Sequence, residues 1–469
     1  METRLGFRWV TIAALAISSA GCGGDGAAPA TTRPSSPPGS PTSVVVDTDL
    51  AIDDLVALAF LLSSDDVDVL AVTVSGTGEV RCPAGIGVMR ALLARTGDDD
   101  VPVACGRSTP LVGTHEFPAG WRDAADAGWG VLVPTDVSEP DGRSAIELLG
   151  DTVQRGVTLL TLGPLTNIAE VLRADRDLAD RVSSIVVMGG AVDVPGNVLD
   201  PALDAARSEW NVYVDPTAAS EVFGAGARVV LVGLDATDRV PVTPEFLERL
   251  AVNSHTAAAS LVASLYEANP LVTSGGAYFW DPLAAAAVVD PGLLTTERTE
   301  LAVVTDAGPD AGRTVRSDEG FPIDVATGAD AAAFEQLLLR TIDGLAPGEE
   351  LLEPPTPVGE AVVRYDGTAC TYDGPASVST GRMRFTFESN DPTWVVAVAH
   401  LTGELTIDEV VAFVDASPQP PESVPGVDDL ALVPPGAPVY VDVRAPAAGV
   451  VCSPPESEGL QVAASLVVE

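Results

Sequence analysis

The sequence contains no lysine and only three histidines, and 67 acidic residues outnumber 25 basic ones to give a formal net charge of -42. Such a chain would repel phosphates, which argues against nucleic acid and anionic membrane surfaces as partners. Long apolar runs are also scarce. A large core is nevertheless possible, because 46% of the 469 residues are hydrophobic and the mean hydropathy is +0.26. This length leaves room for two or more domains.

The N-terminus has the pattern of an export signal. Two arginines precede the apolar run Val10–Ile17, which is too short to span a membrane. The tetrapeptide Ser19-Ala-Gly-Cys22 resembles the box before a lipidated bacterial cysteine. We therefore expect residues 1–22 to be a lipoprotein-type signal with an anchor at Cys22, and residues 23–42, rich in Gly, Pro, Ser and Thr, to be a disordered tether. The expected location is the cell envelope or the exterior. A plain secretory signal is the alternative.

Cysteine is also scarce, with five in the chain. If Cys22 carries lipid, four remain, and an oxidising compartment favours two disulfides. We expect Cys82 to pair with Cys105 and Cys370 with Cys452, because each pair stays within one proposed domain. The sequence does not fix this connectivity, and free buried thiols are the alternative.

Strand and helix patterns alternate from residue 43 to 346. This alternation predicts an α/β domain with a mostly parallel, Rossmann-like open sheet and helices on both faces. An antiparallel addition is expected after Thr299 and over Thr314–Asp324. Residues 347–357 form a proline-rich linker, and residues 358–469 are expected to form a small all-β sandwich with one doubtful helix over Asp408–Val414. The other expected strands are Val44–Val46, Val67–Val74, Val101–Ala104, Val157–Leu162, Ser184–Met188, Arg228–Leu234, Arg382–Glu388, Trp394–Ala399, Val439–Val443 and Leu460–Val468. The expected helices are Glu79–Arg95, Ser144–Arg155, one opening at Pro164, Pro216–Phe223, Thr243–Val252, Thr256–Glu267, Asp281–Val289 and Ala331–Gly344.

Four acids crowd the first strand–helix turn. The β-branched run Val44–Val46 stops at Asp47, and Asp49, Asp53 and Asp54 follow before apolar residues recur at helical spacing. Open α/β sheets bind ligands at this edge, and carboxylate oxygens are the ligands that Ca²⁺ prefers. The turn therefore predicts a metal site with one acid left as a general base. Helix capping together with solvated acids is the simpler alternative.

Polar groups recur at the ends of later predicted strands. Taken singly, each has an ordinary structural explanation, such as a helix cap or a tight turn. Their joint occurrence in this order is more specific. The stretches are Leu162-Gly-Pro-Leu-Thr-Asn-Ile-Ala169, Val187-Met-Gly-Gly-Ala191, Gly196-Asn197, Glu209-Trp-Asn-Val-Tyr-Val-Asp-Pro216 and Tyr278-Phe-Trp-Asp-Pro282.

Together with the acid turn, these stretches resemble the calcium-dependent nucleoside hydrolases, the inosine/uridine-preferring nucleoside N-ribohydrolases, over residues 44–344. The resemblance implies hydrolysis of the N-glycosidic bond of a ribonucleoside, with a nucleoside as partner and Ca²⁺ as cofactor. It implies carboxylate ligands at Asp49, Asp54 and Asp281, a carbonyl ligand at Leu162, and Asp53 as general base on a calcium-bound water. Asn197, Glu209 and Asn211 would hold the ribose hydroxyls, and Asp47 would support the loop.

One departure bears on the base. Many family members have histidine before the last metal aspartate, and Trp280 stands there instead. This resembles a purine-preferring subgroup that activates the base by stacking, and the stretch containing Trp121, Phe117–Arg122, resembles its substrate loop. Purine nucleosides are therefore expected. Packing roles for both tryptophans, and His115 as a proton donor, are alternatives.

Other departures concern the metal turn. Leu50-Ala51 replaces a Gly-containing pair, Gly76-Thr77 replaces Gly-Asn, and residues are inserted between Asn197 and Glu209. These changes motivate a rival hypothesis, a non-catalytic surface lipoprotein that binds calcium and nucleoside.

Two further alternative functions lack residues that they require. A haloacid-dehalogenase-type phosphatase would use Asp47-Thr-Asp49, but position 51 is alanine and no lysine exists to hold the phosphoryl group. A blue-copper site in residues 358–469 would need two histidines, and only His400 lies there. A homo-oligomer, and a partner for residues 358–469, remain open.

Overall fold

The computed structural model describes residues 40–469 except 134–141, 200–201, 204, 274, 347, 392, 404, 417–423, 434, 436–438 and 454–459. Residues 41–469 form one compact unit. The predicted signal, its Cys22 anchor and most of the tether lie outside the described residues and stay predictions. Within the described ranges, no helix is both long and apolar enough to cross a membrane.

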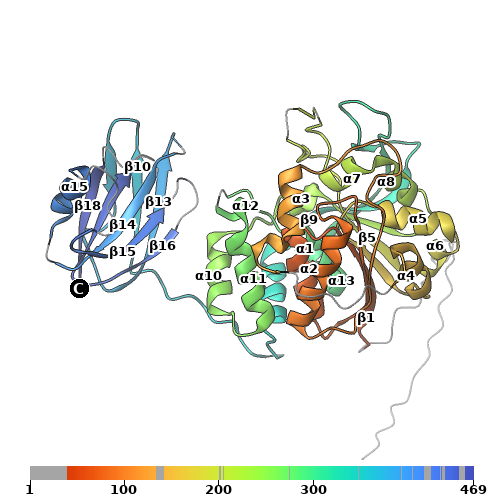
Figure 1. Cartoon of the computed structure of the whole chain (residues 1–469), viewed down its shortest axis with the longest axis horizontal. Coiled ribbons are helices and arrows are strands. Elements are labelled where there is room, and N and C mark those ends of the chain that lie inside the picture. The colour runs from red at the N-terminus through yellow and green to blue at the C-terminus, as the bar shows by residue number, and fades with distance from the viewer. Residues whose placement is uncertain are drawn as a thin grey trace, which may run out of the picture. The chain divides into compact units, whose positions relative to one another are not determined.

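The first strand, β1 (Thr42–Thr48), shows why the α/β domain has two cores. Its valines alternate in direction: Val44 and Val46 join one buried cluster and Val45 joins the other. Helices cover both faces of the sheet, with α1, α2 and α13 on one side and α4, α5 and α6 on the other (Figure 1). A strand buried on both faces is expected to be continuously apolar, and Val44–Val46 form such a run.

The central sheet has nine strands in the order β3-β2-β1-β4-β5-β6-β9-β7-β8. The pairs from β3 to β9 are parallel, and β7 pairs antiparallel with β9 and β8. This confirms the predicted fold class and the antiparallel addition. The remaining strands are β2 (Val67–Val74), β3 (Val103–Cys105), β4 (Thr158–Thr161), β5 (Ser184–Met188), β6 (Val229–Val232), β7 (Leu294–Val303), β8 (Thr314–Arg316) and β9 (Phe321–Ala329).

Most expected helices are present, with shifted ends. The helix expected from Glu79 begins at Cys82, because Pro83 occupies its first turn, where the missing N–H costs nothing. The helices are α1 (Ile52–Leu62), α2 (Cys82–Thr96), α3 (Ala119–Asp126), η1 (Gly128–Gly130), α4 (Ala145–Thr152), α5 (Thr166–Ala174), α6 (Leu178–Arg181), α7 (Trp210–Val214), α8 (Pro216–Phe223), α9 (Leu234–Thr237), α10 (Pro244–Val252), α11 (Ala257–Ala268), α12 (Pro270–Thr273), α13 (Trp280–Val289), η2 (Pro291–Leu293) and α14 (Ala331–Ile342).

The sheet reverses its strand order between β1 and β4. From β1 the chain proceeds outward through β2 and β3, and from β4 it proceeds the other way through β5 and β6. The adjacent C-terminal ends of β1 and β4 therefore leave a crevice, where open α/β sheets bind ligands. The N–H of Leu162, after β4, donates to the carbonyl of Asp47 at 2.8 Å and fixes the two ends side by side.

The C-terminal region forms two sheets around a shared apolar core, with strand orders β11-β10-β13-β16 and β12-β18-β17-β14-β15. The doubtful helix is present as α15 (Ile407–Asp415), with a capping box between Thr406 and Glu409, so the sandwich is not purely β. Its strands are β10 (Gly359–Tyr365), β11 (Cys370–Asp373), β12 (Ser377–Val378), β13 (Gly381–Ser389), β14 (Val395–Leu401), β15 (Val427–Val433), β16 (Val439–Val443), β17 (Ala447–Ser453) and β18 (Gln461–Val468).

Two disulfides confirm the expected pairing of Cys82 with Cys105 and of Cys370 with Cys452. The first joins the start of α2 to the end of β3. The second closes a span of 82 residues within the sandwich. The alternative of free buried thiols is therefore wrong for these four cysteines.

Candidate active site

The acid turn follows β1 and is built on an unusual backbone. Leu50 is fully buried and has φ of 56°, the left-handed region that non-glycine residues seldom occupy. After it, α1 begins at Ile52, with Ala51 as the N-cap residue and no side chain capping the helix. Asp49 and Asp54 are buried rather than solvated. The alternative of a helix cap with solvated acids is therefore wrong.

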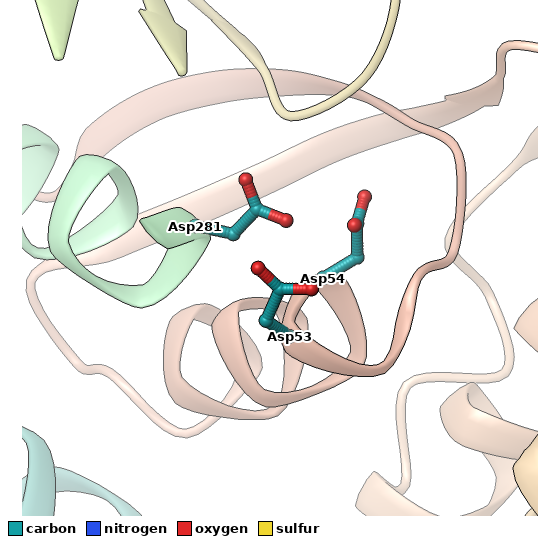
Figure 2. Close-up of side chains that lie close together, drawn as sticks. All are labelled: Asp53, Asp54 and Asp281. Atoms are coloured by element: carbon teal, nitrogen blue, oxygen red, sulfur yellow. The ribbon is translucent and has the colours of Figure 1, made fainter. Parts of the chain in front are cut away.

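Three carboxyl groups come together above this turn. One oxygen from each of Asp53, Asp54 and Asp281 lies within 4.8 Å of the others. Figure 2 shows the first two projecting from the first turn of α1 toward the third, which comes from the start of α13. Residues more than 220 positions apart in sequence thus lie together. The family resemblance implied this for Asp54 and Asp281 as metal ligands, with Asp53 as the base beside them.

Asp49 is not part of that trio, but it is fixed beside it. Its Oδ2 accepts the N–H of Glu79 at 3.1 Å, and its own N–H donates to Asp54 Oδ1 at 3.1 Å. Gly78 and Gly163, which follow β2 and β4, lie against the Asp49 side chain. A Cβ on Gly78 would lie 2.1 Å from the Asp49 Cβ, and a Cβ on Gly163 would lie 2.8 Å from it. Only glycine fits at these two positions, so they set where Asp49 points.

Asp47 lies in β1 just before the turn, and its carboxylate is held by side chains from β2 and α5. It is fully buried, and its Oδ1 accepts hydrogen bonds from Thr73 Oγ1 at 2.6 Å and from Asn167 Nδ2 at 2.7 Å. Burial raises the pKa of Asp47 to about 7, although these two bonds oppose the shift. Asn167 lies within α5 rather than at its cap, and its amide connects β1, β2 and α5.

Burial raises the pKa of all three carboxyl groups of the trio, and neighbouring charges add to the shift for Asp53 and Asp281. Burial is the largest cause for Asp53, and the charge of Asp54 adds to it, so that its pKa rises to about 7. The pKa of Asp281 is raised well above its usual range, by burial first and then by the charges of Asp54 and Asp53. A carboxyl with a pKa near 7 is well suited to take a proton at neutral pH.

Glu79 is an acid that the sequence analysis missed as a site residue. It is buried, and its pKa is raised by burial first and then by the charges of Asp53 and Asp54, so it faces the same cluster. We had assigned it to a helix by periodicity alone. Its position soon after the end of β2, at the same sheet edge as the acid turn, was the available signal.

The donor set fits a hard divalent cation. Asp54 Oδ2 and Asp281 Oδ1 are buried and have no hydrogen-bond partner, which is costly for a carboxylate unless a cation satisfies it. All the donors are oxygens, as Ca²⁺ prefers. The expected carbonyl ligand, Leu162, already accepts a hydrogen bond from Asn211 Nδ2 at 3.0 Å, which leaves one of its two lone pairs for an ion.

The three residues expected to hold ribose lie together after β5. Glu209 is buried and caps α7: its carboxylate accepts N–H groups from Gly190, Asn211 and Val212 at 2.9, 2.9 and 3.2 Å. The backbone N–H of Trp210 donates to Asn197 Oδ1 at 3.1 Å. These contacts fix the orientation of the polar groups, and those of Glu209 leave part of its acceptor capacity for a ligand.

Aromatic side chains gather beside these polar groups. Trp121, on α3, is 40% exposed and lies 5.5 Å from Trp210, which stacks on Phe117 at 5.1 Å. His115 stacks on Tyr213 with ring centroids 4.2 Å apart. Both the stacking residue and the alternative proton donor thus come from one segment before and within α3.

The other expected stacking residue, Trp280, packs partly against the main core. Its ring lies 5.7 Å from that of Tyr278, and its indole N–H is buried without a partner in the structure. Thr77, which replaces the family's asparagine, is buried and bonded to Ser75 and Thr166 at 2.9 and 3.0 Å.

Comparison with known protein families shows which family this chain belongs to. The sequence profile of the inosine-uridine preferring nucleoside hydrolases matches residues 44–336. The chain belongs to this family. It is therefore a nucleoside hydrolase, as the resemblance implied, and the phosphatase rival is wrong.

Two named relatives of this nucleoside hydrolase carry names that specify pyrimidine nucleosides. Uridine nucleosidase 1 of Arabidopsis thaliana is 32% identical over 274 residues, 57% of this chain and 80% of the relative. The pyrimidine-specific ribonucleoside hydrolase RihA of Photobacterium profundum is 31% identical, over 58% of this chain and 87% of its own.

Among solved structures, a plant nucleoside hydrolase, PpNRh1, has a TM-score of 0.58 at 31% identity, covering 65% of this chain and 99% of its own. The purine-preferring ribonucleoside hydrolase of Gardnerella vaginalis has a TM-score of 0.56 at 27% identity, with the same coverage. The shared fold thus serves more than one base.

Proposed function

We propose that this protein is an exported, calcium-dependent hydrolase that cleaves purine ribonucleosides to ribose and free base. The observation that carries the metal requirement is the trio of Asp53, Asp54 and Asp281 with its buried, partnerless oxygens. Asp49, Asp54, Asp281 and the carbonyl of Leu162 would hold the ion. Calcium, when bound, supplies charge that positions the attacking water and the ribose diol and makes that water more acidic.

Asp53 is the residue we assign as general base. It is the most accessible carboxyl of the trio, since Asp54 and Asp281 are buried and Asp53 is only partly so. It needs only hydrogen-bond reach of the water to take its proton as the water attacks the anomeric carbon.

The sugar would lie against Asn197, Glu209 and Asn211. Because backbone hydrogen bonds already fix Glu209, its carboxylate can accept ribose hydroxyls without losing side-chain freedom on binding. Asn211 is held by the carbonyls of Leu162 and Met188, which connects the sugar side of the site to the metal side.

The preference for purines rests on the aromatic side chains. The partly exposed ring of Trp121 offers a flat face beside the ribose residues, and the buried, stacked pair Trp210 and Phe117 packs against it. A two-ring purine gains more from stacking than a pyrimidine does. Trp280, rather than an acid–base residue, stands before Asp281, so stabilisation of the leaving base depends on stacking and delocalisation.

A substrate panel on the parent and on Asp53→Asn tests the activity. We expect base release from inosine, adenosine and guanosine to exceed that from uridine and cytidine, and Asp53→Asn to lower kcat about 10²- to 10⁴-fold while calcium still binds. Asp68→Asn, at an exposed position on β2, is the control and should match the parent. Unchanged rates in Asp53→Asn would remove it as the base. Calcium and nucleoside binding without turnover in the parent would favour the non-catalytic binder.

Export and anchoring are tested separately. We expect the parent to fractionate with membranes and Cys22→Ala to be released in soluble form, because the tether alone has no apolar anchor. Release of both proteins would favour the plain secretory signal.

A further inference from the structure

Two residues of the described chain share a rare backbone conformation and are bonded to each other. Leu50 and Trp129 are the only non-glycine residues with positive φ in the part of the chain that the structure describes, both at 56°. The indole N–H of Trp129 donates to the carbonyl of Leu50 at 3.2 Å. A left-handed non-glycine residue costs free energy and persists only where its surroundings hold it.

Trp129 lies at the centre of a left-handed turn. Gly128 and Gly130 flank it with φ values of 60° and 72°, so three successive residues take the conformation that glycine tolerates best. The two glycines limit the strain to the tryptophan. Its ring packs partly against the main core, which leaves the indole N–H to reach the acid turn.

The carbonyls of the acid turn are each bonded, but only one depends on a side chain. The carbonyls of Thr48, Asp49 and Ala51 accept backbone N–H groups from Ser75, Val80 and Leu55. Only the carbonyl of Leu50 accepts from a side chain, that of Trp129, while the Leu50 N–H donates to Thr48 Oγ1 at 3.1 Å. One substitution can therefore remove the donor to the Leu50 carbonyl without touching an acid.

Trp129 belongs to a segment, residues 117–132, that also borders the proposed nucleoside site. Arg122 of this segment is buried and donates to the carbonyl of Gly76 at 3.0 Å, and Asp126 accepts the backbone N–H of Arg81 at 2.7 Å. Trp121 of the same segment lies against Trp210. The segment thus contacts the acid turn through Trp129 and the ribose-side aromatic residues through Trp121.

We propose that Trp129 is a positioning residue: its indole N–H holds Leu50 in the left-handed conformation that aims Asp49, Asp53 and Asp54, and so couples nucleoside binding on residues 117–132 to metal binding on the acid turn. This inference rests on the proposed function, since it presumes that the acid turn binds calcium. The side-chain bond offsets the strain of a left-handed conformation at a residue other than glycine.

The test is calcium affinity, measured by isothermal titration calorimetry on the full chain without nucleoside. Trp129→Phe keeps an aromatic ring but removes the N–H, and we expect calcium binding to weaken about tenfold, the effect of losing one hydrogen bond to a buried carbonyl. Trp394→Phe, in the sandwich, is the control and should bind calcium like the parent. A lower melting temperature for Trp129→Phe with unchanged calcium affinity would reduce Trp129 to a packing residue and overturn the proposal.

A double-mutant cycle with Leu50→Gly keeps the idea falsifiable if Trp129→Phe folds poorly. Glycine adopts positive φ without strain, so the loss of the indole N–H should weaken calcium binding less in the Leu50→Gly background than in the parent. Equal losses in both backgrounds would overturn the proposal.

Nucleoside kinetics separate this inference from the proposed function. If the parent binds calcium and releases base while Trp129→Phe behaves identically in affinity, kcat and KM, only the positioning role fails. A parent that neither binds calcium nor releases base would overturn the proposed function and this inference with it.

Discussion

The α/β domain buries carboxyl groups, and the C-terminal sandwich does not. Among the described residues, every buried acid lies at or before Asp343, and the buried cluster of the sandwich is entirely apolar. The buried acids are Asp47, Asp49, Asp54, Glu79, Glu209, Asp215, Asp235, Asp281 and Asp343. Since the sandwich shows that this chain can build a core without buried charge, the acids of the α/β domain are retained at a cost in stability, which points to chemistry.

The buried acids are themselves of two kinds. Asp215 and Glu209 satisfy their oxygens with backbone N–H groups, including those at the starts of α8 and α7, whereas Asp54 and Asp281 keep oxygens without a partner. The first kind stabilises the fold through capping, and Glu209 keeps acceptor capacity for ribose as well. The second kind has oxygens free to bind a cation. The predictions below separate these kinds from each other and from the sandwich.

Asp281→Asn should have the largest effect. Removing one carboxylate from the trio should weaken calcium binding more than about 100-fold, beyond the loss usual for a residue that only orients a ligand. Base release should fall accordingly at limiting calcium. Asp215→Asn is the matched control: it removes a buried acid that caps α8, so it should lower the melting temperature but leave calcium affinity unchanged. Calorimetry on both variants decides, and similar calcium affinities in the two would contradict the division.

Asn167→Ala should act on stability more than on metal binding. The substitution leaves Asp47 with one hydrogen bond from Thr73 and deprives the carbonyl of Val74 of a donor. The free energy of unfolding should fall by about 1–3 kcal/mol, as for a buried group that loses its partner. Denaturant unfolding measures this, with Asn390→Ala, at an exposed sandwich position, as the neutral control. A tenfold loss of calcium affinity with unchanged stability would contradict it.

Protein freed of divalent ions should lose stability as pH rises. The folded-state pKa values of Asp47 and Asp53 are about 7, above the usual value of 3.8, so the folded chain binds more protons than the unfolded chain between these pH values. The stability contribution is complete below pH 4 and declines as pH rises through about 7. Thermal melts with chelator should therefore give a lower melting temperature at pH 8 than at pH 6, by several degrees. Added calcium should remove much of this difference, and a higher melting temperature at pH 8 with chelator would refute the prediction.

Removing the sandwich should have the smallest effect on catalysis. The buried clusters of the two regions share no residue, and the sandwich clusters begin at Val358. A chain ending at Pro355 keeps Leu352, which makes two hydrogen bonds with the Asn253 side chain. The Leu352 carbonyl accepts from Asn253 Nδ2 at 2.9 Å, and the Leu352 N–H donates to Asn253 Oδ1 at 2.8 Å. We expect kcat and KM within about twofold of the parent, given independent sites. A loss beyond tenfold would assign the sandwich a part in the site.

The sequence was most informative where one residue's role depends on its neighbours in the chain. Valine runs and the acids after Val46 predicted the sheet and the metal turn, and apolar residues at helical spacing predicted most of the helices, because these are local patterns. The pairing of Asp281 with Asp53 and Asp54 came from resemblance to a family, since no local pattern links such distant positions.

Several site features could not be predicted because they depend on three-dimensional contacts. The amide of Asn167 on Asp47, the pressure of Gly78 and Gly163 on Asp49, and the indole of Trp129 on Leu50 each join segments that are distant in sequence. Glu79 was overlooked because helical periodicity placed it in α2, whereas it precedes that helix. Short elements such as α7 were missed because five residues carry little periodicity.

The disulfide between Cys82 and Cys105 has a practical consequence for anyone preparing this protein. Cys105 directly precedes Gly106, whose backbone lies so close to Asn167 that a Cβ on it would be 1.7 Å from Asn167 Oδ1. The crosslink therefore fixes the backbone next to the hydrogen bond between Asn167 and Asp47. Protein made in a reducing cytoplasm would lack this disulfide near the buried carboxylates. Recombinant enzyme should therefore be produced under oxidising conditions before its calcium affinity or turnover is compared between variants.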